Sequence, residues 1–109
     1  MPIWGTTDVE LQPELILISW SIMLVNGVDW HFVGYAPQNY EGRTSSRIEE
    51  FDLANHVGRS KSGRLYRLNG GPGYNSDAEY TFRRWCDINS VQSVEEITDR
   101  VLSGELVKA

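Results

Sequence analysis

Cysteine is nearly absent from this sequence, since Cys86 is the single one among 109 residues. A chain with one cysteine forms no intrachain disulfide, which is typical of proteins in a reducing compartment, so we expect a cytoplasmic location. Histidine is also scarce, and His31, His56 and Cys86 stand too far apart for the short ligand spacings of a zinc site. The sequence therefore predicts neither a metal nor a cofactor.

Long hydrophobic segments are lacking as well. The most apolar run, residues 15–25, contains two serines and is much shorter than the about 20 apolar residues that a membrane-spanning helix needs. The first ten residues, MPIWGTTDVE, have no basic start followed by an apolar stretch, so they do not resemble a signal peptide. We expect a soluble protein without a membrane partner.

Basic residues are in deficit, with 10 Lys and Arg against 15 Asp and Glu, for a net charge of −5. Nucleic-acid-binding domains usually carry a basic excess on one face, so this balance argues against nucleic acid as the main partner. It gives the chain a mild preference for basic partners. The length and the 40% hydrophobic content are those of one globular domain, residues 1–109.

The clearest local signal is a β-hairpin. Two apolar runs, LILISWSIMLV and VDWHFVGY, flank Asn26-Gly27, and this dipeptide suits a type I′ turn because both central positions need positive φ. Both faces of the hairpin are apolar, so each face needs a cover. A two-residue turn predicts the cross-strand pairs Met23 with Trp30, Ser21 with Phe32, Ile22 with His31, Trp20 with Val33 and Ile18 with Tyr35.

Residues 14–69 are predicted to form a four-stranded antiparallel sheet made of two hairpins. The second, weaker hairpin joins residues 47–52 to residues 57–68, and Ser62-Gly63 inside its long arm indicates a bulge or a tight bend. The other N-terminal segments are predicted to be irregular: a lead-in over residues 1–13 with a short edge strand at 8–11, and a loop over 37–45.

Helix signals occupy residues 76–104, and residues 105–109 are predicted to be a tail. Ser76 and Ser93 each precede a glutamate by three residues, the spacing of a capping box. The first helix is predicted to end near Asn89 and the second at Gly104. Strands followed by helices indicate an α+β fold, with both helices packed on one face of the sheet. Their apolar residues are Ala78, Phe82, Trp85, Cys86, Val94, Ile97 and Val101.

Residues that could act in catalysis occur singly in the sequence, without a partner residue at a diagnostic spacing. His31 lies in the middle of a predicted strand, where a lone histidine is more often structural than a general base. The loop Gly70–Gly73 precedes a helix, but the glycine and lysine pattern of a phosphate-binding loop is absent. A small enzyme or ligand-binding domain that uses His31, Tyr35 and Gly70–Gly73 therefore stays the alternative. His56 is interpreted as a turn residue and Cys86 as a buried apolar residue.

Contact residues are better represented than catalytic ones. Tyr, Trp and Arg dominate the energetics of protein interfaces. The leading hypothesis is a small non-enzymatic binding protein that acts by stoichiometric protein–protein contact, such as an inhibitor, an adaptor or an accessory protein of a mobile element. Four basic residues along the predicted arm 57–68 would form a basic stripe suited to an acidic partner surface or RNA, namely Arg59, Lys61, Arg64 and Arg67. An exposed strand whose charges prevent edge pairing is the plainer interpretation. The candidate binding residues are Trp20, Trp30, Tyr35, Arg59, Arg64 and Arg67.

The first hairpin is apolar on both faces, and this also leads to a prediction about the oligomeric state. Two short helices have enough side chains to cover one face of a four-stranded sheet, which leaves the other face open. Large exposed apolar patches are unusual on monomers, and two-fold dimers are the commonest soluble assembly. The sequence thus predicts either a homodimer or an exposed aromatic patch that includes one or more of Trp4, Trp20, Trp30 and Tyr35.

Overall fold

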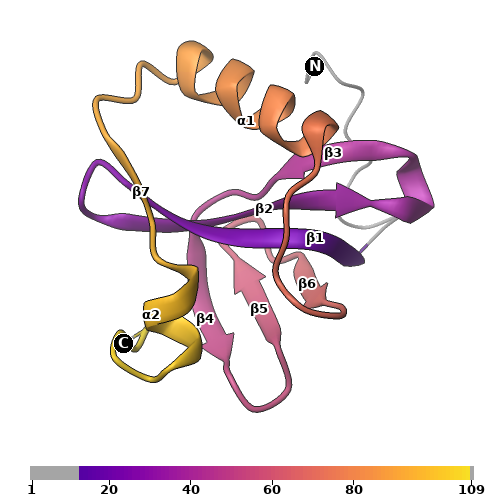
Figure 1. The fold of residues 1–109 in the computed structure, drawn as a ribbon, viewed down its shortest axis with the longest axis vertical. Coiled ribbons are helices and arrows are strands. Elements are labelled where there is room, and N and C mark those ends of the chain that lie inside the picture. Colours follow the sequence, from indigo (N-terminus) through magenta and orange to yellow (C-terminus); the bar gives the residue numbers. More distant parts are fainter. Residues whose placement is uncertain (1–12, 109) are drawn as a thin grey trace.

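The computed structural model describes residues 13–108, which form one α+β domain with a mostly antiparallel seven-stranded sheet and two α-helices (Figure 1). The α+β class is confirmed, whereas four strands is an undercount. The predicted edge strand at 8–11 lies outside the described residues. The elements are β1 (Glu14–Val25), β2 (Asp29–Ala36), the 3₁₀-helix η1 (Pro37–Asn39), β3 (Glu41–Thr44), β4 (Ile48–Asp52), β5 (Val57–Ser60), β6 (Leu65–Leu68), α1 (Ser76–Ile88), β7 (Val94–Glu96) and α2 (Thr98–Leu102).

The sheet curls back on itself. Its strand order is β3-β2-β1-β6-β5-β4, yet β3 and β4, at opposite ends of this order, are joined by residues 45–47 alone. Two hydrogen bonds join Ser45, in the bend over residues 45–47, to β2. The Ser45 backbone N–H donates to the Phe32 carbonyl and the Ser45 Oγ accepts from the Phe32 N–H, both at 2.9 Å. Inside the curl the Phe32 ring contacts Phe51 and Tyr66 edge-on, with ring centroids 5.8 and 5.9 Å apart.

Strand β1 is the centre of the sheet. Its first residues pair in parallel with β6, from Glu14 opposite Leu65 to Leu17 opposite Leu68. Its last residues pair with β2 on one side and with β7 on the other, both antiparallel. The prediction of a purely antiparallel sheet is therefore wrong at β6. This strand ends the β4-β5-β6 meander and reaches β1 in the same direction as β1 itself.

The first hairpin turns at Asn26-Gly27 as predicted, with φ of 54° and 69°. Its loop has three residues rather than two, because Val25 pairs with Asp29. The pairs nearest the turn are therefore displaced by one residue from the predicted register, and become Leu24 with Trp30, Met23 with His31, Ile22 with Phe32 and Ser21 with Val33.

A β-bulge at Ser19-Trp20 cancels this displacement. Ser19 has a φ of 47°, and the register shifts between Ile18 and Ser21, so that the predicted pair Ile18 with Tyr35 is confirmed. The extra residue also changes which side chains point inward. Leu15 and Leu17, which precede Ser19, and Trp20 and Ile22, which follow it, consequently enter one buried cluster.

Two apolar clusters lie on opposite sides of β1 and β2. The larger one fills the curl and is closed by Ile97 and by Val101 of α2. The smaller one joins Val25 and Val33 to Ala78 and Phe82 of α1. The two helices thus pack against different clusters, and the prediction that they share one face of the sheet is not confirmed. The predicted tail also packs, since Leu106 lies against the larger cluster and the Lys108 ammonium lies 5.6 Å from the centre of the Trp30 ring.

The first helix follows its prediction closely and ends at Ile88, with Asn89 as its C-cap. The predicted capping box at Ser76 is wrong by one residue, because Asn75 is the N-cap and its Oδ1 accepts from the Ala78 N–H at 2.9 Å. An asparagine side chain reaches the free N–H groups of the first turn as well as a serine does. The helix therefore begins with Ser76 inside it.

The second predicted helix is shorter than expected and is preceded by a short strand. Residues 94–96 form β7, and α2 spans Thr98–Leu102 only. The capping box at Ser93 is wrong because the turn of the first hairpin holds this residue, with the Asn26 N–H donating to the Ser93 carbonyl at 2.8 Å and the Asn26 Oδ1 accepting from the Ser93 N–H at 3.2 Å. Gly104, with a φ of 85°, follows α2 as predicted.

Two other segments differ from expectation. The predicted loop over residues 37–45 contains η1 and β3, so it adds a strand to the edge of the sheet. The long arm over residues 57–68 is divided into β5 and β6 by a tight turn, in which the Gly63 N–H donates to the Ser60 carbonyl at 2.9 Å. The bend predicted from Ser62-Gly63 is confirmed.

Candidate functional site

The aromatic candidates lie largely inside the fold. Trp20 is fully buried, and its indole N–H lies 3.2 Å from the Asn69 carbonyl and 3.3 Å from that of Gly70. Trp30 is buried too, whereas Tyr35 is half-buried. The prediction that Trp20 or Trp30 forms an exposed patch is wrong, because the bulge and the curl turn both rings into the core. Trp4 lies outside the described residues.

The arginine candidates do not form an uncompensated basic stripe. Arg64 is buried, with 2% of its surface exposed. Arg59 forms an ion pair with Glu50, and Arg67 forms one with Glu14. Opposite charges on neighbouring strands neutralise the arm, which favours its interpretation as a charged, exposed strand surface.

The His31 side chain is fixed by one hydrogen bond and one ring contact. Its Nδ1 lies 2.8 Å from the Ser45 carbonyl, and because a carbonyl only accepts, Nδ1 carries the hydrogen. The ring also packs on Trp85, with centroids 4.6 Å apart. Burial lowers the pKa of His31, which favours the neutral imidazole. These contacts are those of a structural histidine that links β2 to the bend between β3 and β4.

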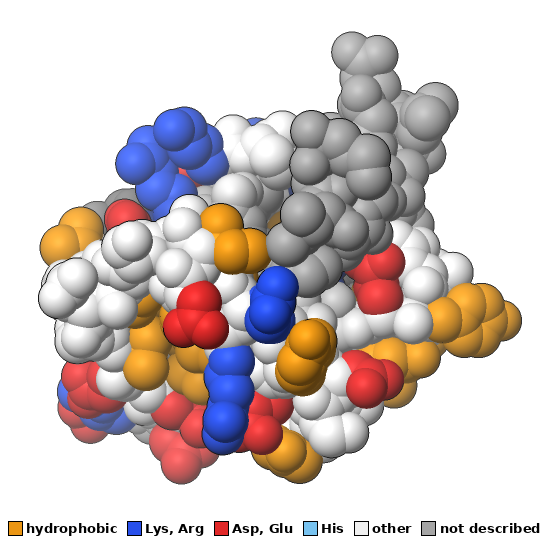
Figure 2. Space-filling view, turned by 90° about the horizontal axis from the view of Figure 1, so that it is seen from above, with side chains coloured by type: hydrophobic (Ala, Val, Ile, Leu, Met, Phe, Trp, Pro, Cys, Tyr) orange, Lys and Arg blue, Asp and Glu red, His pale blue; other side chains and the backbone are white. Residues whose placement is uncertain are grey.

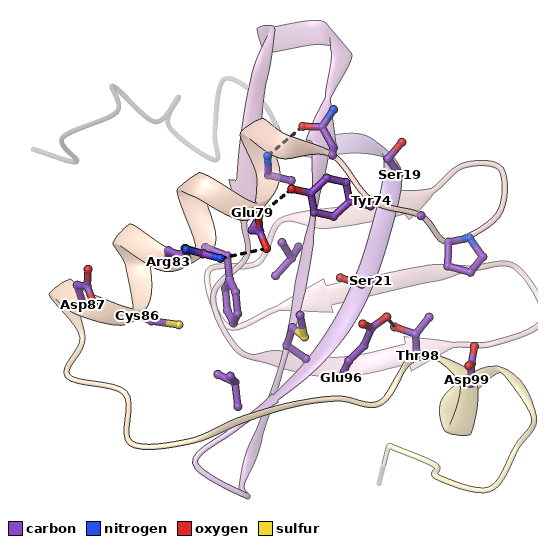
Figure 3. Close-up of a pocket in the computed structure, with 18 residues that line it drawn as sticks. Ser19, Ser21, Tyr74, Glu79, Arg83, Cys86, Asp87, Glu96, Thr98 and Asp99 are labelled. Carbon is purple, nitrogen blue, oxygen red and sulfur yellow. Dashed lines mark hydrogen bonds and ion pairs between the residues drawn. The ribbon is translucent and has the colours of Figure 1, made fainter.

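A groove of about 950 Å³ opens between α1 and the β7–α2 segment (Figure 3). Its floor contains Ser19, Ser21 and Met23 of β1 with Val33 of β2. Residues 72–75, which lead into α1, close one end. Of the groups in the alternative hypothesis, Pro72 and Gly73 of the Gly70–Gly73 loop line this groove, whereas His31 and Tyr35 do not.

The groove exists because β1 has no flanking strand between its pairings with β6 and β7. Single hydrogen bonds to two other segments replace the missing ladder. The backbone N–H of Gly73, in the loop before α1, donates to the Trp20 carbonyl, and the Ile22 N–H donates to the side-chain Oγ1 of Thr98 in α2, each at 3.0 Å. The small side chains of Ser19 and Ser21 fill little of the gap between these contacts. A hollow therefore remains above the middle of β1.

The α1 side of the groove combines an apolar surface with a fixed polar group. Ala78 and Phe82 are buried against the floor. Above them the Glu79 carboxylate accepts a hydrogen bond from the Tyr74 hydroxyl at 2.7 Å and lies 3.5 Å from the Arg83 guanidinium. The bond to Glu79 raises the pKa of Tyr74. The carboxylate is thus held by two side chains.

The opposite side is acidic. The Glu96 Oε2 accepts from the Thr98 Oγ1 at 3.1 Å, and that hydroxyl in turn accepts from the backbone of β1. Asp99 follows at the start of α2, and Asp87 lies at the far end of the groove (Figure 3). Cys86 is half-buried beside Asp87, and burial raises the pKa of its thiol. The groove is therefore apolar below and negatively charged along its rims.

The face of the molecule that carries α1 has a mixed surface (Figure 2). Figure 2 shows acidic, basic and hydrophobic side chains interspersed on the side of the molecule that carries α1. Within residues 13–108 no group of three metal-ligating side chains comes together. In the same range no helix has the length and apolar character needed to cross a membrane. The groove is therefore the candidate functional site among the described residues.

Comparison with known proteins adds no functional information. Searches against models of protein families, curated proteins and solved structures find no match. Functional inference therefore rests on the groove and its chemistry. The sequence contains one signal of this site, the serines at positions 19 and 21, which interrupt an otherwise apolar strand.

Proposed function

We propose that this protein is a small non-enzymatic binding protein, an inhibitor, adaptor or accessory protein, which contacts another protein stoichiometrically through the groove between α1 and β7–α2. The observation that carries the proposal is the shape and chemistry of the groove. Binding sites typically combine an apolar surface with a few placed polar groups. Here Met23, Val33 and Phe82 supply the first, and Glu79 and Glu96 supply the second.

The polar groups of the groove support binding rather than bond-breaking chemistry. Glu79 is engaged by Tyr74 and Arg83, and Glu96 is engaged by Thr98. Carboxylates held in this way are preorganised, which lowers the entropy lost on binding. A side chain that acts as a general base must instead lie within hydrogen-bond reach of the nucleophile whose proton it removes. Neither histidine lines the groove.

A matched pair of surface variants tests this proposal. Val94 lines the groove and is 48% exposed, whereas Val107 is 80% exposed and lies away from it. Both valines tolerate lysine because their side chains already reach solvent. We expect that immobilised wild-type protein and Val107→Lys capture the same partner from lysate of the native host, and that Val94→Lys loses it. Equal capture by both variants contradicts the groove as the binding surface.

A small-molecule ligand is the second candidate. The groove volume of about 950 Å³ falls within the range of ligand pockets, about 300–1,000 Å³. Native mass spectrometry of the protein purified from its host decides between the candidates. A bound mass that Val94→Lys releases and Val107→Lys retains favours the ligand, and an unloaded protein that captures a partner favours the protein contact.

A homodimer and a cytoplasmic location also stay proposals. The described part of α1 carries two apolar side chains that are more than half exposed, Tyr80 at 62% and Ile88 at 56%, and these are available to a second copy. Light scattering of the purified protein distinguishes 12.4 kDa from twice that mass. Fractionation of the native host tests the location.

A further inference from the structure

The groove carries unbalanced negative charge. Its lining contains four carboxylates, those of Glu79, Asp87, Glu96 and Asp99, against one guanidinium, that of Arg83. Arg83 is committed to Glu79 at 3.5 Å. Within residues 13–108 none of the other three acids takes part in an ion pair. Three carboxylates therefore line the groove without an ion-pair partner among the described residues.

The floor adds a second requirement. Met23, Val33 and Phe82 present apolar surface between the charged rims. A ligand that fits both features carries cationic groups and apolar groups close together. Lysine and arginine combine the two in one side chain, because an apolar stem bears the charged end. A simple inorganic cation matches the rims and leaves the floor uncovered.

The β7–α2 side of the groove carries two of its acids, Glu96 and Asp99. Glu96, Thr98 and Asp99 line one side of the groove, across from Glu79 and Arg83 (Figure 3). The Thr98 hydroxyl fixes Oε2 of Glu96, while Oε1 has no hydrogen bond from the described residues. The Glu96 carboxylate is therefore held in place through Oε2, and its Oε1 can accept a hydrogen bond from a cationic side chain.

We propose that the groove binds a basic, partly apolar polypeptide segment of the partner protein. An apolar side chain of that segment covers Met23 and Phe82, and a lysine or arginine lies against Glu96 and Asp99. This inference rests on the function proposed above and adds the chemistry of the partner. Charge complementarity of this kind mainly sets specificity and association rate.

Three short capped peptides are the probes, with lysine and leucine, glutamate and leucine, or lysine and serine in alternation. We expect the lysine–leucine peptide to bind with a Kd below about 1 mM, and the other two to bind at least several-fold more weakly. Binding also weakens several-fold between about 0.1 M and about 1 M salt, because the Debye length falls from about 10 Å to about 3 Å.

Variants of Glu96 localise the effect. Glu96→Gln retains an oxygen that accepts from Thr98 but removes the charge, and we expect an affinity loss of about threefold. Glu96→Lys is expected to weaken binding about tenfold or more. The control is Glu105→Lys, which changes an exposed residue outside the groove lining by the same net charge. It should keep the affinity within about twofold, because exposed charges at a distance are screened.

The outcomes distinguish failure of the basic-partner inference from failure of the proposed function, which is protein contact through the groove. Equal binding of the glutamate–leucine peptide, or equal effects of Glu96→Lys and Glu105→Lys, overturns a basic partner. The absence of binding by the lysine–leucine peptide overturns it as well. If Val94→Lys still abolishes capture of the native partner in those cases, the groove remains the contact surface and only the basic character fails. If capture is also unaffected, both proposals fail.

Discussion

Gly42 of β3 sets the distance between α1 and the sheet, and alanine at this position tests that packing. A Cβ on Gly42 would lie 2.3 Å from the Asp77 carbonyl oxygen and 2.6 Å from the Ala78 nitrogen. These are backbone atoms of the first turn of α1, so no side-chain rotation relieves the contact. Ordinary contact begins at 3.4 Å, which means that the helix must move by about 1 Å.

Overpacking a closed interface costs about 1–3 kcal/mol, and a rigid backbone neighbour places Gly42→Ala in the upper part of that range. For a domain of this size each kcal/mol shifts the Tm by roughly 4–8 °C, so we expect a decrease of roughly 10–20 °C. Urea unfolding followed by tryptophan fluorescence gives the free energy directly. Because α1 is a wall of the groove, capture of the partner should weaken as well.

Gly71→Ala is the control for Gly42→Ala. A Cβ on Gly71 meets no atom within 4 Å, and its φ lies outside the left-handed region. Alanine there reduces the entropy of the unfolded chain and should leave stability unchanged or raise it by up to about 1 kcal/mol. If Gly42→Ala is as stable as Gly71→Ala, β3 and α1 do not pack as described, and the reasoning is refuted.

Three other predictions concern the hairpin, the core and pH. Gly27→Val should destabilise the domain by about 1–2 kcal/mol, because Gly27 has a φ of 69° and a β-branched residue resists that conformation; an unchanged urea midpoint contradicts this. Trp20→Phe should lower the free energy of unfolding by about 2 kcal/mol in the same assay, because the smaller ring leaves a cavity and the indole N–H no longer donates to the carbonyls of Asn69 and Gly70. A decrease below about 0.5 kcal/mol contradicts the buried position. Burial lowers the pKa of His31, so the unfolded chain binds the proton more tightly and stability falls as the pH drops below about 6.5; an NMR titration of the imidazole should give a pKa below that value, and a pKa at or above it contradicts the burial.

The local elements of this fold could be predicted because their signals are local. Asn26-Gly27 marks the first hairpin through its tolerance of positive φ, and the helical spacing of Ala78 and Phe82 marks α1. The register near the turn could not be predicted from the dipeptide alone, since the loop includes Val28 as a third residue. The bulge at Ser19 then restores the pair farthest from the turn.

The non-local features were beyond the sequence pattern. The parallel pairing of β1 with β6 depends on how the whole β4-β5-β6 meander returns to the sheet. The strand β7 forms where a helix is predicted, because Asn26 binds Ser93 from 67 positions away. A capping box is a weak local preference, and tertiary contacts override it.

The site was the least predictable part. Tryptophans were expected at the surface because their two strands are apolar on both faces, and the curl of the sheet places both rings inside. The groove forms from β1, β2, residues 72–75, α1, β7 and α2, so the serines at positions 19 and 21 mark one part of its floor and no single segment predicts the whole site. Its acids are spread along the sequence and come together only in the folded chain.

An NMR titration of the labelled protein with the captured partner, or with the lysine–leucine peptide, tests the groove most directly. We expect the largest amide shift changes at residues that line it, such as Ser21, Phe82, Val94 and Asp99. The turn between β4 and β5, represented by Leu53, should change little. Shift changes centred on that turn, or spread evenly over the domain, would contradict the groove as the binding surface.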